Sequence, residues 1–414
     1  MINCNPSGGL IMEKVKMGVV GLGGRGQYHA ELLSTFNDVD VTAVCDVYPD
    51  RIESAAKRVE RSSGKRPDGY LDYREMFAKS GIDAVVIASS WTTHTRIAVA
   101  AMKAGVIPAS EVGGAASIEE CYSLVKTAEE TGIEPMFLEN CNFGREELAL
   151  LNMTKMGLFG EIVHCQCGYE HCLRDEITRG NENRHYRFNN YAHRNGELYP
   201  THGLGPMSKI LNINRGNRFV SIVSVASKQT GLNTHAKKLF GQEHPANNVI
   251  FTQGDVVTSV IKCAGGETIL LTHDTSNFRP YSRAGRVQGT NGIWLEDKNA
   301  ICLESENAGE VWKPFSEYMD KYDHPIWKKF STVDLEKYGH GGMDYIVDAA
   351  FVDSVKNGHH PAIDVYDWAS WIAVTVLSEQ SVALGGTPQL FPDFTNGSWL
   401  DKTTPKGEGE FCLD

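Results

Sequence analysis

Short apolar runs alternate with helix-like stretches through the first third of the chain. The runs are KMGVVG, VTAVCDV, AVVIAS, VIPASEV and PMFLEN, and amphipathic segments such as RIESAAKRVE and TRIAVAAMKAG lie between them. Continuous Val, Ile and Ala runs joined by helices are typical of a parallel sheet that is covered on both faces. The pattern therefore predicts a doubly wound α/β domain over residues 1–140.

A glycine-rich loop follows the first of these predicted strands. Gly21-Leu22-Gly23-Gly24-Arg25-Gly26 matches GxGxxG and opens the first predicted helix. Such glycines allow a tight turn and a close approach of the backbone to a pyrophosphate at the helix N-terminus. Asp46 ends the second strand, 20 residues after Gly26, which is the spacing expected for the carboxylate that holds an adenosine ribose. The sequence thus predicts a Rossmann domain that binds NAD in preference to NADP.

Beyond Asn140 the pattern changes to strands without intervening helices. The runs are EIVHCQCGYEH, RFVSIVSVAS, DVVTSVIKCA, ETILLTHDTS and GRVQGTNGIWLE. They predict a C-terminal α+β domain over residues 141–414 with a large, mostly antiparallel open sheet. Two helical stretches follow, the second expected to pack on the sheet, and the polar last dozen residues are expected to be mobile. An open sheet needs cover, so we also expect a homo-oligomer.

Charge and composition restrict the class of partner. The net charge is −12, from 52 acidic and 40 basic residues, which argues against a nucleic-acid partner and favours a small uncharged substrate. No apolar run approaches the roughly 20 residues of a membrane helix, and residues 1–17 lack an export signal, so we expect a cytoplasmic protein that does not bind membranes. Most cysteines are scattered, and Cys165, Cys167 and Cys172 suit a strand and its continuation. These thiols are expected to be reduced packing residues with no metal bound.

The segment ELYPTHGLGP places Tyr199 and His202 three residues apart with no serine or cysteine nucleophile beside them. Histidine titrates near neutral pH, and tyrosine can act as a base when a cation lowers its pKa from about 10. The glycines and proline that follow place His202 near the start of a helix. The pair therefore indicates proton transfer rather than covalent catalysis.

Other titratable residues allow more than one interpretation. Glu139, at the end of PMFLEN, is a candidate classical catalytic carboxylate with Asp274 as its partner, or a residue of the cofactor site or a buried network. His171, His185 and His193 lie in a polar segment, but their spacing matches no compact metal-binding pattern. His340 precedes a predicted helix and is expected to be a helix-terminus residue.

The glycine loop, Asp46, the segment Trp91-Thr92-Thr93-His94 and the sheet-rich second half resemble the glucose-fructose oxidoreductase and inositol dehydrogenase superfamily. Dehydrogenases of that superfamily usually carry Glu-Lys-Pro after the fifth strand, and the lysine takes part in proton transfer with the substrate hydroxyl. Here the corresponding residues are Glu111-Val112-Gly113. The missing lysine weighs against an ordinary sugar dehydrogenase.

A resemblance over nearly the whole chain is more specific. FLENCNFGREEL, GLFGEIVH, LYPTHGLGP, RPYSRAGRVQGTNG, GHGGMDY and PDFTNGSW resemble the NAD-dependent glycosidases of glycoside hydrolase family 109, best known as α-N-acetylgalactosaminidases. The expected NAD-site residues, from the loop motif and the resemblance together, are Gly21, Gly23, Gly24, Arg25, Gly26, Asp46, Trp91, Thr92, Thr93, His94, Glu111, Val112 and Asn140. The resemblance implies that the sugar is bound by Tyr169, Arg187, Tyr199, Pro200, Thr201, His202 and Tyr281.

The resemblance also implies a redox-neutral reaction. NAD oxidises carbon 3 of the sugar, the resulting ketone acidifies carbon 2, the leaving group is eliminated, water adds, and the hydride returns to carbon 3. We expect His202 to accept the 3-hydroxyl proton and Tyr199 to handle the carbon 2 proton or assist the leaving group. Tyr169 and Tyr281 would orient the ring, and Arg187 would bind substrate oxygens or stabilise a tyrosinate. The alternatives are a dehydrogenase that releases a 3-ketosugar and a non-catalytic NAD-binding sugar sensor.

Overall fold

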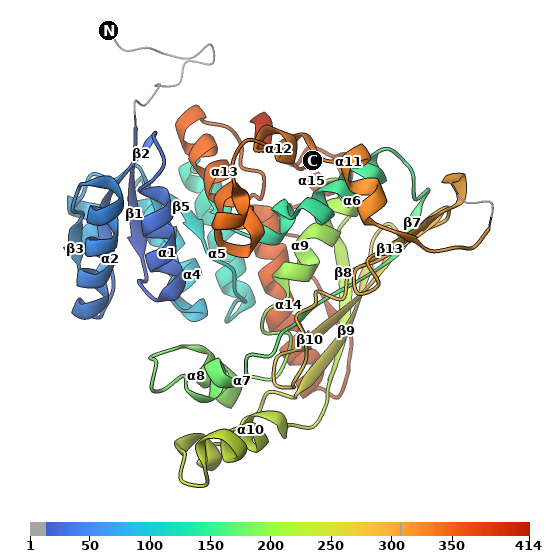
Figure 1. Ribbon diagram of the computed structural model, residues 1–414, viewed down its shortest axis with the longest axis horizontal. Helices are drawn as coiled ribbons and strands as arrows, with labels where there is room; N and C mark the ends of the chain where they lie inside the picture. The colour runs from blue at the N-terminus through green and yellow to red at the C-terminus, as the bar shows by residue number, and fades with distance from the viewer. Residues whose placement is uncertain (1–13, 307–308) are drawn as a thin grey trace.

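The computed structural model describes residues 14–306 and 309–414, so residues 1–13 of the segment inspected for an export signal lie outside it. Its N-terminal part is a six-stranded sheet in the order β3-β2-β1-β4-β5-β6 with every neighbouring pair parallel (Figure 1). The strands are β1 (Val15–Val20), β2 (Val39–Cys45), β3 (Asp68–Tyr70), β4 (Ala84–Ile87), β5 (Ile107–Ser110) and β6 (Met136–Phe137). This confirms the predicted doubly wound domain, and its strand order reverses between β1 and β4, where such sheets bind ligands.

Local sequence sets the ends of the helices that connect these strands. The helices are α1 (Gly24–Leu33), α2 (Pro49–Ser63), α3 (Tyr73–Lys79), α4 (His94–Lys103) and α5 (Ile118–Thr131), with the 3₁₀ turn η1 (Trp91–Thr93) before α4. Helix α2 begins with Pro49 and ends at Gly64, whose φ of +74° is left-handed. Helix α5 begins where the Ser117 hydroxyl accepts a hydrogen bond from the Glu120 backbone N–H.

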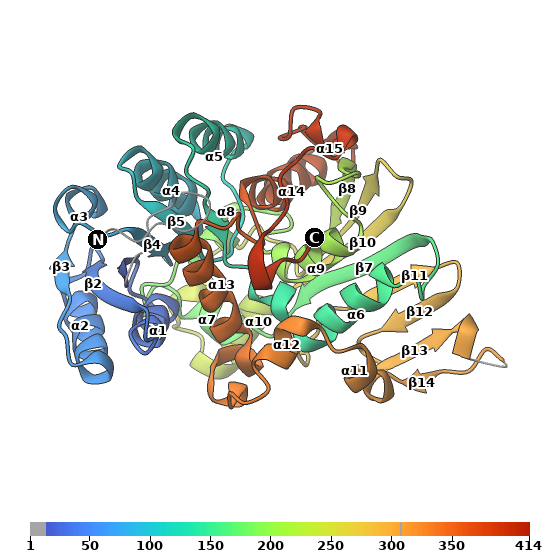
Figure 2. The ribbon, with the colours of Figure 1, turned by 90° about the horizontal axis from the view of Figure 1, so that it is seen from above.

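The C-terminal domain contains a nine-stranded sheet in the order β14-β13-β12-β11-β7-β10-β9-β8-β15 (Figure 2). The strands are β7 (Ile162–Glu170), β8 (Phe219–Ala226), β9 (Val256–Cys263), β10 (Thr268–Asp274), β11 (Arg286–Gly289), β12 (Gly292–Leu295), β13 (Ala300–Leu303), β14 (Lys313–Pro314) and β15 (Gln389–Leu390). Only the pair β7 and β10 is parallel among these strands, which confirms the predicted mostly antiparallel sheet. The run GRVQGTNGIWLE forms the hairpin β11–β12 rather than one strand.

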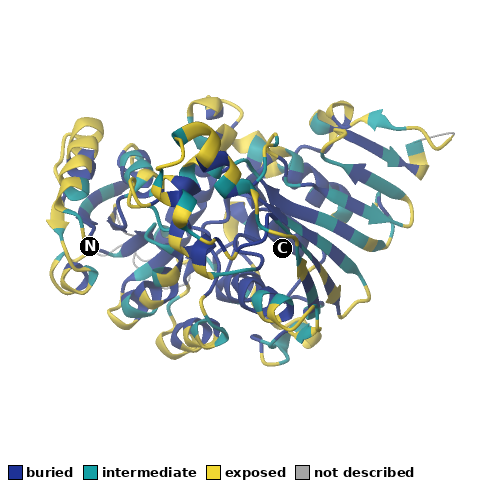
Figure 3. Ribbon diagram, turned by 90° about the horizontal axis from the view of Figure 1, so that it is seen from below, coloured by how far each residue is buried: buried dark blue, intermediate teal, exposed yellow. Residues whose placement is uncertain are grey.

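Helices cover one face of this sheet, and burial alternates along its strands as Figure 3 shows. Helix α9 packs on β7 and helix α14 on β8. The remaining helices are α6 (Arg145–Lys155), α7 (Arg174–Thr178), α8 (Arg187–His193), α9 (Thr201–Ile210), α10 (Gly231–Phe240), α11 (Ser316–Tyr322), α12 (Pro325–Lys329), α13 (Met343–Asn357), α14 (Val365–Ala383) and α15 (Ser398–Asp401). On β9 and β10 the buried Ile261 and Ile269 face the helices, whereas Val260 and Leu270 lie on the opposite face.

The C-terminal segment joins the two domains. Helix α14 contacts both β8 and helix α5, and α13 contacts α1 and β1 of the nucleotide-binding domain. The expectation of a mobile tail is wrong, because Phe411 and Leu413 are buried and the Asp414 carboxylate pairs with Lys209 and Arg215 at 3.1 Å each. The buried apolar side chains and the ion pairs of Asp414 hold the end of the chain in place. The polar composition of this segment did not reveal these contacts.

Candidate active site

A cavity of about 930 Å³ lies at the carboxyl ends of the parallel strands, between the two domains. Its wall runs from the glycine loop after β1, past the ends of β2, β4 and β5, to the start of α9. The size is that of a site for a cofactor and a small molecule. Its position is the one where doubly wound sheets bind nucleotides.

The glycine loop fits a dinucleotide. Gly21 has a φ of +88°, and a Cβ there would lie 2.4 Å from the Ser89 backbone nitrogen, while a Cβ on Gly26 would lie 1.7 Å from the Gly21 carbonyl oxygen. By contrast, a Cβ on Gly24 would meet nothing within 4 Å. Helix α1 also starts at Gly24 without a side-chain cap, so its first backbone N–H groups can bind a phosphate.

Asp46 holds the loop and faces the cavity. Its Oδ2 accepts a hydrogen bond of 2.6 Å from the Leu22 backbone N–H, and its Oδ1 accepts one of 3.0 Å from that of Tyr48. Arg51 Nη1 lies 3.9 Å from the same carboxylate, a neighbour that the strand-end motif did not predict. The carboxylate at this end of the cavity fits an adenosine ribose with two free hydroxyls.

A buried charge network supports the middle of the cavity. Arg25 donates through Nη2 to Glu111 Oε1 at 2.6 Å and through Nη1 to Asp344 Oδ2 at 2.7 Å. His29 Nε2 lies 2.7 Å from the same Glu111 oxygen and its Nδ1 2.9 Å from Asp348 Oδ2. Burial opposes a charge on His29, but the Asp348 and Glu111 carboxylates raise its pKa to about 10. The network holds Glu111 in a fixed position. The next residue, Val112, stands where dehydrogenases of the superfamily usually have a lysine.

Most of the predicted NAD-site residues lie in the cavity wall. Those that line it are Gly21, Gly23, Gly24, Arg25, Asp46, Thr93, His94, Glu111, Val112 and Asn140. Three others are placed differently. Gly26 packs on the Gly21 carbonyl, Trp91 is buried beneath Tyr199 with ring centres 5.5 Å apart, and Thr92 is exposed on η1. The motif thus combines residues that face the cavity with residues that shape it.

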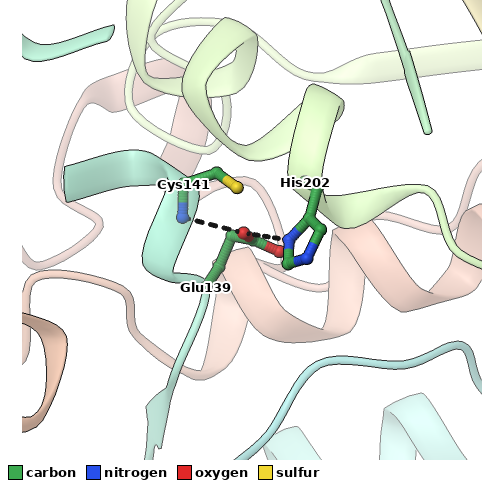
Figure 4. Close-up of side chains that lie close together, drawn as sticks. All are labelled: Glu139, Cys141 and His202. Carbon is green, nitrogen blue, oxygen red and sulfur yellow. Dashed lines mark hydrogen bonds and ion pairs between the residues drawn. The ribbon is translucent and has the colours of Figure 1, made fainter. Parts of the chain in front are cut away.

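His202 is paired with a fully buried carboxylate. Helix α9 begins at Thr201, and His202 Nδ1 lies 2.6 Å from Oε1 of Glu139, which follows β6. The same oxygen accepts the Cys141 backbone N–H, as Figure 4 shows. Burial opposes a charge on the imidazole, but Cys141 and Glu139 raise the pKa of His202 well above its usual value. An imidazole so oriented has the chemistry to accept or donate a proton at the cavity wall.

Two tyrosines pack against this histidine. The ring centres of Tyr169 and Tyr199 lie 4.5 Å apart, and that of Tyr199 lies 4.9 Å from His202. The Tyr169 hydroxyl lies 3.1 Å from His171 Nδ1. Burial and the neighbouring Tyr169 raise the pKa of Tyr199 well above 10, although Arg187 opposes this shift.

Arg187 enters the same cluster from helix α8. Its guanidinium lies 4.9 Å from the ring centres of both Trp91 and Tyr199. Its Nε lies 2.6 Å from Glu176 Oε1, a close ion pair without the alignment of a hydrogen bond. Within the described residues, its buried Nη1 has no hydrogen-bond partner, so it can donate to a substrate oxygen.

The predicted sugar-binding residues also divide into those that line the cavity and those that lie outside its wall. Tyr169, Arg187, Tyr199 and His202 line the cavity, whereas Pro200 and Thr201 are buried at the start of α9 and are absent from the wall. Tyr281 is 48% exposed outside the wall, with its ring 5.1 Å from that of His171.

Asp274 and Glu139 do not form a catalytic pair. Asp274 binds Arg279 at 3.2 Å, and the Glu139 carboxylate binds His202. The classical interpretation of these two residues is therefore wrong. Glu139 instead has the buried-network role that was the alternative.

A polar segment of the C-terminal domain reaches across to the nucleotide-binding domain. Arg184 pairs with Asp50 at 2.7 Å, and Arg51 donates to the Asn183 carbonyl at 3.3 Å. Tyr186, His185 and Glu176 of this segment line the cavity. The Arg, Asn and His content of this segment was the only sequence signal for these contacts, because pairing across domains leaves no local periodicity.

A parallel nucleotide-binding domain, an open sheet and a cluster of histidine, tyrosine and arginine side chains between them define a two-domain fold that binds NAD. Residues 15–136 match the family model described as the oxidoreductase family, NAD-binding Rossmann fold, and residues 143–401 match glycosyl hydrolase 109, C-terminal domain. The chain belongs to glycosyl hydrolase family 109.

Curated relatives support this assignment, and solved structures share the fold. The chain is 39% identical to alpha-N-acetylgalactosaminidases of Tannerella forsythia, with 94% of this chain and 88% of that one covered, and of Shewanella oneidensis, with 94% and 86% covered. A levoglucosan dehydrogenase in complex with NADH and levoglucosan has the same fold, with a TM-score of 0.69 at 18% identity over 92% of this chain and all of the other. The scyllo-inositol dehydrogenase of Lactobacillus casei gives 0.65 at 14% identity, with 92% and 98% covered. No helix of the described residues is long and apolar enough to cross a membrane.

Proposed function

We propose that this chain is an NAD-dependent, redox-neutral glycoside hydrolase that acts on α-N-acetylgalactosaminides or related glycosides. The relatives named alpha-N-acetylgalactosaminidase support the substrate class. One structural observation carries the reaction type. Among the described residues the carboxylates that line the cavity are Asp46, Glu111 and Glu176, and each is bound to a backbone N–H or a basic side chain. A classical glycosidase needs two carboxylates free to act at the anomeric carbon.

Bound NAD supplies a hydride acceptor for carbon 3 of the sugar and returns the hydride at the end of the cycle. His202 accepts the proton of the 3-hydroxyl, and the Glu139 carboxylate 2.6 Å away stabilises the resulting imidazolium. The imidazole can accept this proton only in its neutral form. A positively charged cofactor held in this cavity would lower the raised pKa of His202.

We propose that the carbon 2 proton moves to Tyr169 rather than to Tyr199. The Tyr169 hydroxyl has an imidazole acceptor, His171 Nδ1, at 3.1 Å, so it can pass on its own proton as it takes one from carbon. The raised pKa of Tyr199 keeps that phenol protonated, which suits donation to the leaving group. Of the two roles expected for Tyr199 from the sequence, this proposal keeps help to the leaving group, and it replaces the ring-orienting role expected for Tyr169.

Arg187 is proposed to bind a sugar or acetamide oxygen through Nη1. Stacking on Trp91 and Tyr199 fixes the plane of its guanidinium, so the donor direction is set before substrate binds. Its positive charge would also stabilise the enolate oxygen that forms when carbon 2 loses its proton.

A net dehydrogenase that releases a 3-ketosugar and NADH is the second candidate, because the fold is that of sugar dehydrogenases. Val112, buried in the cavity wall where the superfamily has lysine, weighs against it. Incubation of the protein with NAD and nitrophenyl α-N-acetylgalactosaminide, followed at the absorbances of nitrophenol and NADH, separates the candidates. Nitrophenol without net NADH supports the hydrolase, and NADH in proportion to sugar contradicts it. Absence of both products would favour a sugar sensor.

We also propose a homo-oligomer formed through the outer face of the nine-stranded sheet. Val260, 47% exposed, pairs across strands with Val223 and Leu270, so apolar side chains adjoin on a face without helices. Val260→Lys should lower the mass measured by light scattering to that of a monomer. Leu239→Lys on the exposed side of α10 is the control and should leave the mass unchanged. An unchanged mass in Val260→Lys would contradict this interface.

We also propose that the protein is cytoplasmic. It is supported by the free thiols of Cys45, Cys121, Cys165, Cys167 and Cys263, which are typical of a reducing compartment. Fractionation of source cells against a marker of the exported fraction tests it. Recovery of the protein with that marker would contradict it.

A further inference from the structure

A third side chain with ligand chemistry lies beside the Glu139–His202 pair. Cys141 belongs to the 3₁₀ turn η2 (Asn140–Phe143), and its side chain points towards the imidazole in Figure 4. The Cys141 sulfur, a His202 ring nitrogen and a Glu139 carboxylate oxygen all lie within 4.8 Å of one another, and all three residues are buried. We call this cluster the Glu-Cys-His trio.

Sulfur, imidazole nitrogen and carboxylate oxygen are the three ligand types of protein zinc sites. Zinc binds them at about 2.0–2.3 Å in a tetrahedron, which places ligand atoms about 3.3–3.8 Å from one another. Glu139 Oε1 and His202 Nδ1 are now 2.6 Å apart around a shared proton, so a metal in place of that proton requires them to separate by about 1 Å.

A second observation points to a ligand at the trio. Glu139 is fully buried, yet among the described residues its Oε2 has no hydrogen-bond partner. Buried carboxylate oxygens are normally satisfied, and an unpartnered one beside a thiol and an imidazole is available to coordinate a cation.

The cavity gives access to the trio. His202 lines it, whereas Glu139 and Cys141 are absent from its wall, so an ion from solvent reaches the trio past the imidazole. Three protein ligands leave a fourth position for water, as in zinc sites that stay open to exogenous ligands.

We propose that the Glu-Cys-His trio binds a thiophilic divalent cation such as Zn²⁺ and that this binding inhibits the enzyme. The thiol proton and the proton shared by Glu139 and His202 leave to solvent as the metal–sulfur, metal–nitrogen and metal–oxygen bonds form. A metal on Nδ1 removes the Glu139 contact that stabilises the imidazolium, so His202 can no longer accept the 3-hydroxyl proton. The inhibition therefore rests on the proposed function, whereas the binding does not. The reaction proposed above includes no step that uses a metal.

Binding is tested with Co²⁺ on the full-length protein without NAD or sugar. One equivalent should produce a thiolate-to-cobalt charge-transfer absorption in the near ultraviolet, and Zn²⁺ should displace it. Cys141→Ser should lose this absorption and bind about 100-fold more weakly, because even partners of metal ligands contribute about 10- to 100-fold. Cys172→Ser is the matched control, since its half-buried thiol contacts Arg174 instead of the trio. Absence of the absorption in the unmodified protein, or its persistence in Cys141→Ser, would overturn the metal site.

Inhibition is tested separately. Zn²⁺ should reduce nitrophenol release by the unmodified protein and by Cys172→Ser, a chelator should restore it, and Cys141→Ser should need about 100-fold more Zn²⁺ for the same inhibition. Equal sensitivity of the two variants would refute the inhibitory role. If the protein releases no nitrophenol at all, the proposed function fails while the cobalt spectrum still decides the metal site. Unchanged circular dichroism of Cys141→Ser shows that loss of binding is not loss of fold.

Discussion

Replacing Glu139 with Gln tests whether the buried carboxylate controls the proposed base. The substitution keeps the shape of the side chain and an oxygen that can accept from the Cys141 N–H and from His202 Nδ1. It removes the negative charge that lies 2.6 Å from the imidazole. The expected defect is therefore in proton transfer, with the cavity wall left in place.

The size of the defect follows from this contact. A hydrogen bond to a charged group contributes about 1.5–3 kcal/mol, so weakening it as the imidazolium forms should lower kcat about 10- to 100-fold. Loss of the whole acid–base contribution would lower it about 100- to 10,000-fold. The Kd for NAD should stay unchanged, because Glu139 does not line the cavity.

The pH profile distinguishes a proton-transfer role from a structural one. The carboxylate helps to raise the pKa of His202, so its removal lowers that pKa and keeps the imidazole neutral at lower pH. The acidic limb of the profile of kcat/KM against pH should move to lower pH in Glu139→Gln. Glu379→Gln is the control, because Glu379 pairs with Arg194 at 2.7 Å outside the cavity wall. A profile that keeps its acidic limb, or a loss of activity that follows a loss of NAD binding, would refute the reasoning.

Three further predictions concern the tyrosine, the glycine loop and the buried network. Tyr169→Phe should lower kcat about 100- to 10,000-fold and should abolish the exchange of solvent deuterium into carbon 2 of the sugar. Mass spectrometry measures this exchange, and unchanged exchange would contradict the role of Tyr169. Gly26→Ala should lower the melting temperature, because its Cβ would overlap the Gly21 carbonyl, whereas Gly24→Ala meets no neighbour and should melt like the unmodified protein. The raised pKa of His29 stabilises the fold fully below pH 6.5, and this stabilisation is lost as the pH rises towards 10. The free energy of unfolding measured in urea should therefore fall over that pH range. In His29→Asn the free energy of unfolding should depend less on pH.

Local patterns predicted the features that local chemistry determines. The parallel sheet followed from continuous apolar runs, and the position of Asp46 followed from the spacing after the glycine loop. His202 lies in the first turn of α9, as the glycines and proline after it indicated. Each of these features depends on residues within one βα unit or one turn.

The missed features depend on pairs far apart in the chain. Glu139 and His202 are 63 residues apart, and Arg25 and Asp344 are 319 apart. No periodicity or motif encodes such a pair, because each carboxylate sits at the end of its own element and only the packing of two domains brings its partner near. The Asp274 interpretation failed for the same reason, since a carboxylate's partner cannot be read from its strand.

The distribution of charge explains why the site suits proton and hydride transfer. Glu111 is held by Arg25 and His29, and Glu176 by Arg187, so the acids of the cavity wall are neutralised where a sugar would bind. A carboxylate that is bound in this way is a poor nucleophile, because its lone pairs are already engaged. Glu139 is absent from the cavity wall and contacts it through His202. A carboxylate in this position can stabilise a protonated imidazole but cannot attack a sugar carbon. An oxidation–elimination route requires such proton transfer and needs no carboxylate nucleophile.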